Sequence, residues 1–157
     1  MPSSCGLQHF ILDGRLMNNI KIEIDSIVED LDDAGLVDNS DKTHTIADGK
    51  MIFEGDSIRI SYSETNENVT TSSDIIIKGS EVSVKRSGAV EYEFRFIEGK
   101  STKSLYSVPP YSFDTEIYTR KIRKDFNGPS GRLSLIYDMT IGGAKKKTRM
   151  NIYVSGK

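Results

Sequence analysis

The sequence lacks tryptophan and contains one cysteine and four prolines among its 157 residues. Because Cys5 has no second cysteine to pair with, no intrachain disulfide can form, which is typical of proteins in a reducing compartment. The N-terminal residues carry no basic segment followed by a long apolar run, and no later run is long enough for a membrane helix. We therefore expect a cytoplasmic protein without a membrane partner.

Catalytic and cofactor signatures are also missing. His9 and His44 lie in or near irregular segments, and the sequence pairs neither with a serine or cysteine nucleophile. Together with Cys5 they are too few and too scattered for a zinc site. The chain has no P-loop and no dinucleotide-binding fingerprint. We therefore expect no enzymatic activity, no cofactor and no metal.

The net charge is only −2, but the charges are segregated along the chain. Residues 1–78 contain 6 basic and 15 acidic residues (net −9), and residues 79–157 contain 15 basic and 8 acidic residues (net +7). In a closed sheet the first and last strands meet, so the two halves could simply attract each other there. The alternative is a functional basic surface in the second half, although the small net charge makes nucleic acid an unlikely partner.

The chain is rich in short runs of Val, Ile, Tyr, Phe and Thr, separated by glycine-centred turns and without a convincing helix. Such an unbroken series of strands must hide its edges by closing or by packing as a sandwich. We predict an all-β fold, a single antiparallel up-and-down β-barrel of about 9–10 strands with room for an interior cavity. A β-sandwich is the alternative. Residues 1–18 are expected to form an N-terminal tail and residues 19–157 the barrel domain, with strands at 19–27, 44–54, 57–64, 71–78, 81–86, 90–97, 103–108, 112–122, 132–141 and 148–154.

An acidic segment, residues 25–41, follows the first predicted strand. It contains no base and includes turn-forming residues, so we interpret it as a long loop. Asp30, Asp32, Gly35 and Asp41 follow the spacing of an EF-hand calcium loop. However, Ala34 stands at an expected ligand position and the flanking segments are predicted strands. A solvated acidic loop is therefore favoured over a calcium site.

Two predicted strands, 57–64 and 81–86, carry apolar residues at alternate positions and end in a charge on the same face. Because side chains two apart share a strand face, Glu64 and Arg86 are expected to point inward at one rim. Thr71 and Ser73 begin the strand between them, and Tyr92 begins the next strand at that rim. These five residues are predicted to form the polar mouth of a ligand site on an apolar barrel. The alternative is a Glu64–Arg86 pair that only fixes strand register and closes one end.

Three stretches resemble one known family: Tyr62-Ser63-Glu64, the RSGAV run at residues 86–90 and the GRLSLIYDM run at residues 131–139. With their spacing they are similar to the YwiB-like family, small bacterial calycin-like barrels without an established activity. The resemblance implies a lipocalin-like barrel, and it implies ligand binding only by analogy at the level of the fold. The lipocalin Gly-X-Trp motif is absent, since the chain has no tryptophan.

We therefore expect a cytoplasmic barrel protein that binds a small, partly apolar molecule, with the polar mouth at Glu64 and Arg86 facing its polar or anionic end. The alternative is an interaction module that binds an acidic partner or nucleic acid through the basic C-terminal half. Its candidate contacts are the basic clusters at residues 120–124 and 145–149. The sequence does not indicate an oligomeric state.

Overall fold

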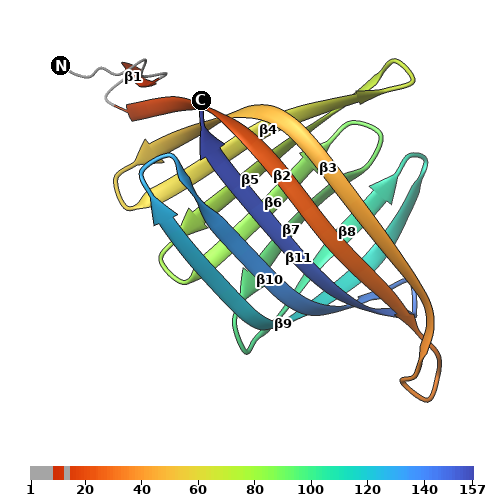
Figure 1. The fold of residues 1–157 in the computed structure, drawn as a ribbon. Coiled ribbons are helices and arrows are strands. Elements are labelled where there is room, and N and C mark those ends of the chain that lie inside the picture. The colour runs from red at the N-terminus through yellow and green to blue at the C-terminus, as the bar shows by residue number, and fades with distance from the viewer. Residues whose placement is uncertain (1–8, 13–14) are drawn as a thin grey trace.

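The computed structural model describes residues 9–12 and 15–157, and its eleven strands form one antiparallel sheet (Figure 1). Ten of these strands, β2 to β11, close into a barrel because β2 pairs with both β3 and β11. The predicted all-β up-and-down barrel is thus confirmed, in place of the sandwich. The strands are β1 (His9–Leu12), β2 (Arg15–Leu31), β3 (Val37–Glu54), β4 (Ser57–Asn66), β5 (Val69–Lys78), β6 (Glu81–Ser87), β7 (Glu91–Ile97), β8 (Ser101–Val108), β9 (Tyr111–Asn127), β10 (Ser130–Ile141) and β11 (Ala144–Gly156).

Part of the predicted N-terminal tail, residues 9–12 and 15–18, belongs to the sheet. β1 pairs with the first residues of β2, and β2 begins at Arg15. Residues 1–8 and 13–14 of the predicted tail, which include Cys5, lie outside the described residues. In the described part of the chain, no helix is long and apolar enough to span a membrane.

The barrel interior is packed with apolar side chains that alternate along each strand. Ile20, Ile22, Met51, Ile60 and Leu133 are fully buried. Burying each such side chain stabilises the fold by roughly 1.5–3 kcal/mol. Aromatic rings of β7 and β10 belong to this buried cluster. The packing includes the Phe96 and Tyr137 rings, whose centroids are 4.8 Å apart. A small interior cavity lies at one end of the barrel and is described below.

The acidic segment at residues 25–41 is not a long loop, so that prediction was wrong. β2 and β3 run through most of it and are joined by a tight turn at residues 32–36. The Asp32 carboxylate accepts a hydrogen bond from the Leu36 backbone at 2.9 Å, and Gly35 adopts a positive φ of 82°. β2 stays extended because β11 pairs with it along this stretch. Lys146 of β11 donates a hydrogen bond to the Asp30 carboxylate at 2.5 Å.

One side of the barrel opens where β3 and β4 separate. They pair from Glu54 to Gly49, which faces Tyr62. Beyond that pair β3 extends back to Val37 and β4 extends to Asn66, and the described sheet does not pair these extensions with each other. Figure 1 shows β3 and the β4–β5 hairpin diverging from this point. Gly49 permits the close crossing, since a Cβ there would lie 2.3 Å from the Ser61 carbonyl oxygen.

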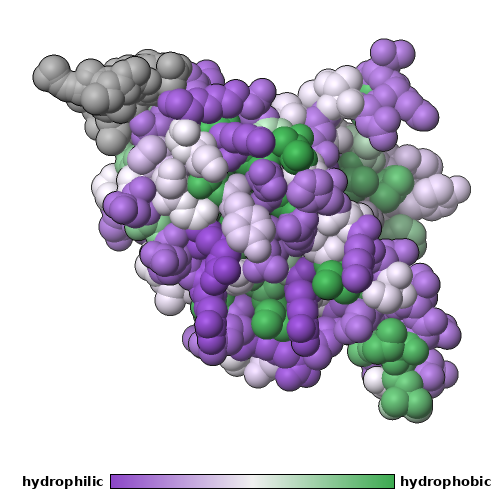
Figure 2. Space-filling view, viewed as in Figure 1, coloured by the Kyte–Doolittle hydropathy of each residue, from purple (hydrophilic) through white to green (hydrophobic). Residues whose placement is uncertain are grey.

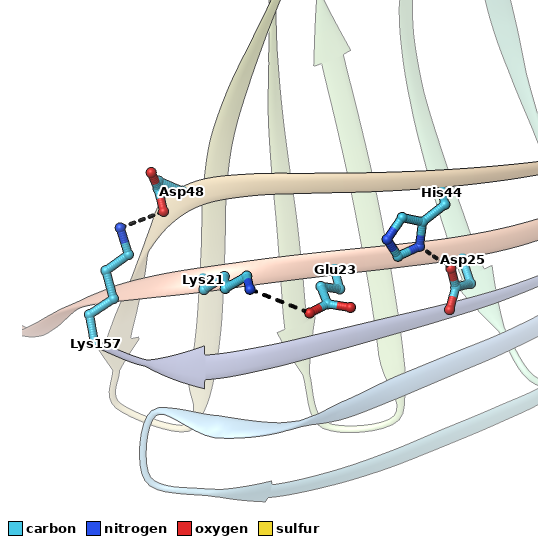
Figure 3. Close-up of polar contacts among 6 residues, drawn as sticks. All are labelled: Lys21, Glu23, Asp25, His44, Asp48 and Lys157. Carbon is cyan, nitrogen blue, oxygen red and sulfur yellow. Dashed lines mark hydrogen bonds and ion pairs between the residues drawn. The ribbon is translucent and has the colours of Figure 1, made fainter.

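The outer surface in Figure 2 is mainly hydrophilic over β2, β10 and β11, with hydrophobic residues gathered at the tip of the β2–β3 hairpin. Leu36 and Val37 at this tip are 67% and 55% exposed. Charged pairs follow the outer face of β2 and β3 and reach the C-terminus (Figure 3). They are Lys21–Glu23 at 3.7 Å, His44–Asp25 at 2.5 Å and Lys157–Asp48.

Candidate functional site

A row of directly opposed residues crosses the inner wall at the open end of the barrel. It runs through Tyr62 of β4, Ser73 of β5, Arg86 of β6, Tyr92 of β7 and Tyr106 of β8. Each residue is the cross-strand partner of the next, so their side chains project from the same face. The row therefore concentrates one guanidinium and three phenols beside the point where β3 leaves β4.

Glu64 and Arg86 meet across this end of the barrel. Arg86 Nη2 donates a hydrogen bond to Glu64 Oε1 at 3.4 Å, which is long for a charged pair. Their side chains are 36% and 30% exposed, so solvent still reaches both. Thr71 lies opposite Glu64 and Ser73 lies opposite Arg86, and both are buried. Tyr92 lies opposite Arg86 on the next strand, so the structure brings the five predicted residues together. That these residues bind a ligand stays a prediction.

The electrostatic environment holds Arg86 in its charged form. Burial of Arg86 opposes its charge, but ionised Tyr92 and Tyr62 at high pH, hydrogen bonding with Tyr92 and the charge of Glu64 together outweigh burial, so the pKa of Arg86 is raised above its ordinary value. Burial raises the pKa of Tyr92 to about 12 and raises that of Tyr62 as well. At neutral pH the site therefore presents a guanidinium cation beside neutral phenols.

The guanidinium is incompletely paired. Arg86 Nε is buried and has no hydrogen-bond partner among the described residues. A buried donor without an acceptor costs roughly 1–3 kcal/mol, and arginine has five N–H donors to satisfy. The long contact to Glu64 satisfies one other nitrogen of the group. Arg86 is therefore able to accept an additional anionic partner.

A cavity of about 110 Å³ lies against this cation. Its polar lining includes the predicted Glu64, Arg86 and Tyr92, whereas Thr71 and Ser73 do not line it. The rest of the wall is mostly apolar, with a few hydroxyl groups. It comprises Ile24, Ile75, Val84, Met150 and Ile152, together with Ser26, Thr43, Thr45 and Tyr62.

Sequence reasoning missed the hydroxyl residues on the β2–β3 side of the cavity. Ser26 and Thr43 lie in or beside the segment that was interpreted as a loop, and their hydroxyl oxygens are 2.7 Å apart. The signal was present, because Ser26 continues the inward alternation of Ile22 and Ile24. Tyr62 also lines the cavity and was not among the five predicted site residues.

The basic second half makes ion pairs with nearby acids. Lys146 of β11 meets Asp30 of β2 at 2.5 Å across the barrel closure. Arg120 meets Asp138 at 2.6 Å between β9 and β10. The first contact matches the simple explanation of the charge segregation, in which opposite charges attract where the first and last barrel strands meet.

The acidic segment does not form an arrangement suited to a metal ion. Asp30 lies on β2 and Asp41 on β3, so the two are held on neighbouring strands rather than in one loop. Over the ranges that the structure describes, no three His, Cys, Asp or Glu side chains are grouped so that they could hold a metal.

Comparison with known proteins places the chain in a family. A family model described as a domain of unknown function, DUF1934, matches residues 27–152. The chain belongs to the DUF1934 family. One relative in this comparison is the uncharacterized β-barrel protein YwiB of Bacillus subtilis (strain 168), 27% identical over 123 residues that cover 78% of this chain and 82% of YwiB.

A solved structure supports the same assignment. The crystal structure of the ywiB protein from Bacillus subtilis superposes with a TM-score of 0.78 at 26% identity, covering 90% of this chain and 93% of that chain. The predicted resemblance to YwiB-like proteins is thus confirmed. The DUF1934 family has no assigned function, so the activity of this member must be argued from its own site.

Proposed function

We propose that this DUF1934 protein binds a small organic anion, whose charged end pairs with Arg86 and whose short apolar body fills the adjacent cavity. The supporting observation is the half-buried guanidinium beside an apolar-walled cavity, with an Nε that has no partner within residues 9–12 and 15–157. A largely apolar pocket with a few convergent polar groups is the usual form of a ligand site. The single cysteine supports the expected cytoplasmic location of this binding protein.

The volume of the cavity limits the size of the ligand. A buried apolar cavity of about 150 Å³ accommodates benzene. The cavity here measures about 110 Å³, so it suits a body of only a few carbon atoms. The walls supplied by Ile75, Val84 and Ile152 favour an aliphatic body over a polar one.

Glu64 would compete with the bound anion for Arg86. In the free protein its carboxylate contacts Arg86 at 3.4 Å, longer than the 2.7–2.9 Å usual for charged hydrogen bonds. A ligand carboxylate able to approach both Nε and one Nη can form the shorter, bidentate geometry. Arg86 is then the anchor, and Glu64 is a counter-charge that the anion displaces.

Titration with straight-chain carboxylates from acetate to hexanoate, followed by calorimetry or ligand-observed NMR, tests this function. Each methylene that enters the cavity adds about 0.8 kcal/mol, so affinity should rise about fourfold per carbon and then stop rising once the cavity is full. Arg86→Met should abolish this dependence. Arg95→Met is the matched control, since Arg95 pairs with Glu81 at 3.0 Å in an exposed position. Equal binding to wild type and Arg86→Met would refute the proposal.

A further inference from the structure

We infer that the anion is the C-terminal carboxylate of an extended polypeptide, which adds as a strand to the free edge of β3. This inference rests on the function proposed above and names the partner of that site. It combines three features at the open end of the barrel, as the described residues show it: a strand edge without a neighbour, a cation with an unpartnered nitrogen, and a cavity large enough for one short side chain.

The first feature is the edge of β3. Among the strands that the structure describes, β3 has β2 beside it along its length, but has β4 on its other side only from Gly49 to Glu54. Residues 37–48 therefore present backbone N–H and C=O groups that another chain could pair with. The end of β4 beyond Tyr62 is likewise paired only with β5 in the described sheet. β3 and the end of β4 run apart in Figure 1, and an added extended segment would pair with the β3 edge.

The second feature is the position of this edge beside the cation. Thr43 and Thr45 belong to the free part of β3, and both line the cavity that Arg86 also lines. Glu64, on the free end of β4, lines it from the other side. An added strand would therefore have its backbone on the β3 edge and its end at the guanidinium. Strand addition and capture of a terminal carboxylate are both established modes of peptide recognition.

The third feature is the composition of the edge. Natural sheet edges are commonly protected by proline, by bulges or by inward charges. Residues 43–47 read Thr-His-Thr-Ile-Ala, without proline, and the inward Thr43 and Thr45 are uncharged. Ile46 is 57% exposed on the opposite face. β-branched residues suit strand pairing, so this stretch is unprotected where it borders the cavity.

The geometry also gives the direction of the bound chain. Arg86 belongs to the cross-strand row that begins with the last β3–β4 pair, Gly49–Tyr62, at the closed end of the gap. For its terminal carboxylate to reach Arg86, the bound peptide must therefore run from the Val37 end of the gap toward Gly49, which is parallel to β3. Its upstream residues would lie beside Asp41 and Asp38, which favours a basic residue there. Asp41 is four residues from Thr45, a distance of roughly 13 Å along a strand.

A pool of acetylated, fully randomised octapeptides tests the inference, with half of the pool carrying a free C-terminal carboxylate and half a C-terminal amide. Peptides retained by the immobilised wild-type protein are identified by mass spectrometry. We expect enrichment of free-acid peptides that end in a small aliphatic residue and carry a basic residue upstream. Arg86→Met should lose this enrichment and Arg95→Met should keep it. The amide peptides provide the same comparison without any change to the protein.

Hydrogen exchange then locates the bound peptide. An enriched peptide should protect backbone amides within residues 37–48, and its backbone N-methylated analogue should bind at least tenfold more weakly. Equal retention of acids and amides, or binding without protection of β3, would overturn the inference. If short carboxylates bind as proposed above but free-acid peptides are not enriched, the ligand is a free small molecule and only the inference fails. If neither class binds, the proposed function fails with it.

Discussion

The coupling free energy between Glu64 and Arg86 distinguishes a binding site from a structural ion pair. We predict that a double-mutant cycle of Glu64→Gln and Arg86→Met gives a coupling free energy of about 0.5–1 kcal/mol, as for solvent-exposed pairs. The pair has one contact at 3.4 Å, and its side chains are 36% and 30% exposed, so solvent screens the attraction. A buried pair that fixed strand register would instead lose about 3–5 kcal/mol when one partner is removed.

Arg86→Met adds a second, opposing effect. The substitution removes the buried Nε donor that has no partner among the described residues, which relieves roughly 1–3 kcal/mol of desolvation cost. Methionine also retains an apolar stem that packs against the wall of the cavity. The variant is therefore expected to be close to wild type in stability, or slightly more stable, while losing the ability to bind the anion.

Urea unfolding of wild type, both single variants and the double variant measures this coupling, with unchanged m-values confirming that the same transition is compared. The same cycle on the exposed pair of Arg95 and Glu81, which has two contacts at 3.0 Å, provides the scale for a surface pair. Coupling above about 2 kcal/mol between Glu64 and Arg86, with marked destabilisation by Arg86→Met, would show instead that the ion pair is structural. The pair would then serve the register of the barrel.

Three further outcomes are expected. Gly49→Ala should lower the free energy of unfolding by about 1–3 kcal/mol in urea melts, because its Cβ would meet a backbone carbonyl at 2.3 Å; an unchanged midpoint would contradict this. The pKa of His44 is raised above its ordinary 6.5 by hydrogen bonding to Asp25, so the stabilisation from this contact is complete below pH 6.5 and is lost as pH rises through the folded-state pKa. NMR titration should show the raised value in wild type and a return toward 6.5 in Asp25→Asn. Alkaline difference spectroscopy should give Tyr92 a pKa of about 12. Its titration step is identified as the one that is missing from Tyr92→Phe. A pKa near the ordinary value of 10 would show that this phenol is more exposed than the structure has it.

Local alternation was sufficient to predict that Glu64 and Arg86 point inward at the same end of the barrel. The strands that end in Glu64 and Arg86 follow a period of two residues, so each inward side chain follows from its neighbours on the same strand. Most strands could also be predicted, because glycine turns separate the runs of strand-forming residues clearly. These features depend on residues close together in the chain.

Features that depend on distant segments were not accessible. Residues 28–31 and 37–41 look like a loop in isolation. They are strand because β11, more than a hundred residues later, pairs with residues 28–31 of β2, and β2 pairs in turn with β3. The free edge of β3 depends on where the β3–β4 register ends, which the sequence of neither strand states. The cavity is lined by side chains from seven strands, so its size depends on packing between segments that are distant in the sequence.

The most direct test of the account is the NMR signal of the Arg86 Nε–Hε group during titration with butyrate. The signal can be assigned by its loss in Arg86→Met. This donor has no partner in the described part of the chain, and an anion bound in the cavity should give it an acceptor. Its resonance should therefore shift in a saturable way while that of Arg95 stays constant. An Arg86 signal that remains unchanged throughout the titration would contradict the claim that this guanidinium is the anchor of a ligand site.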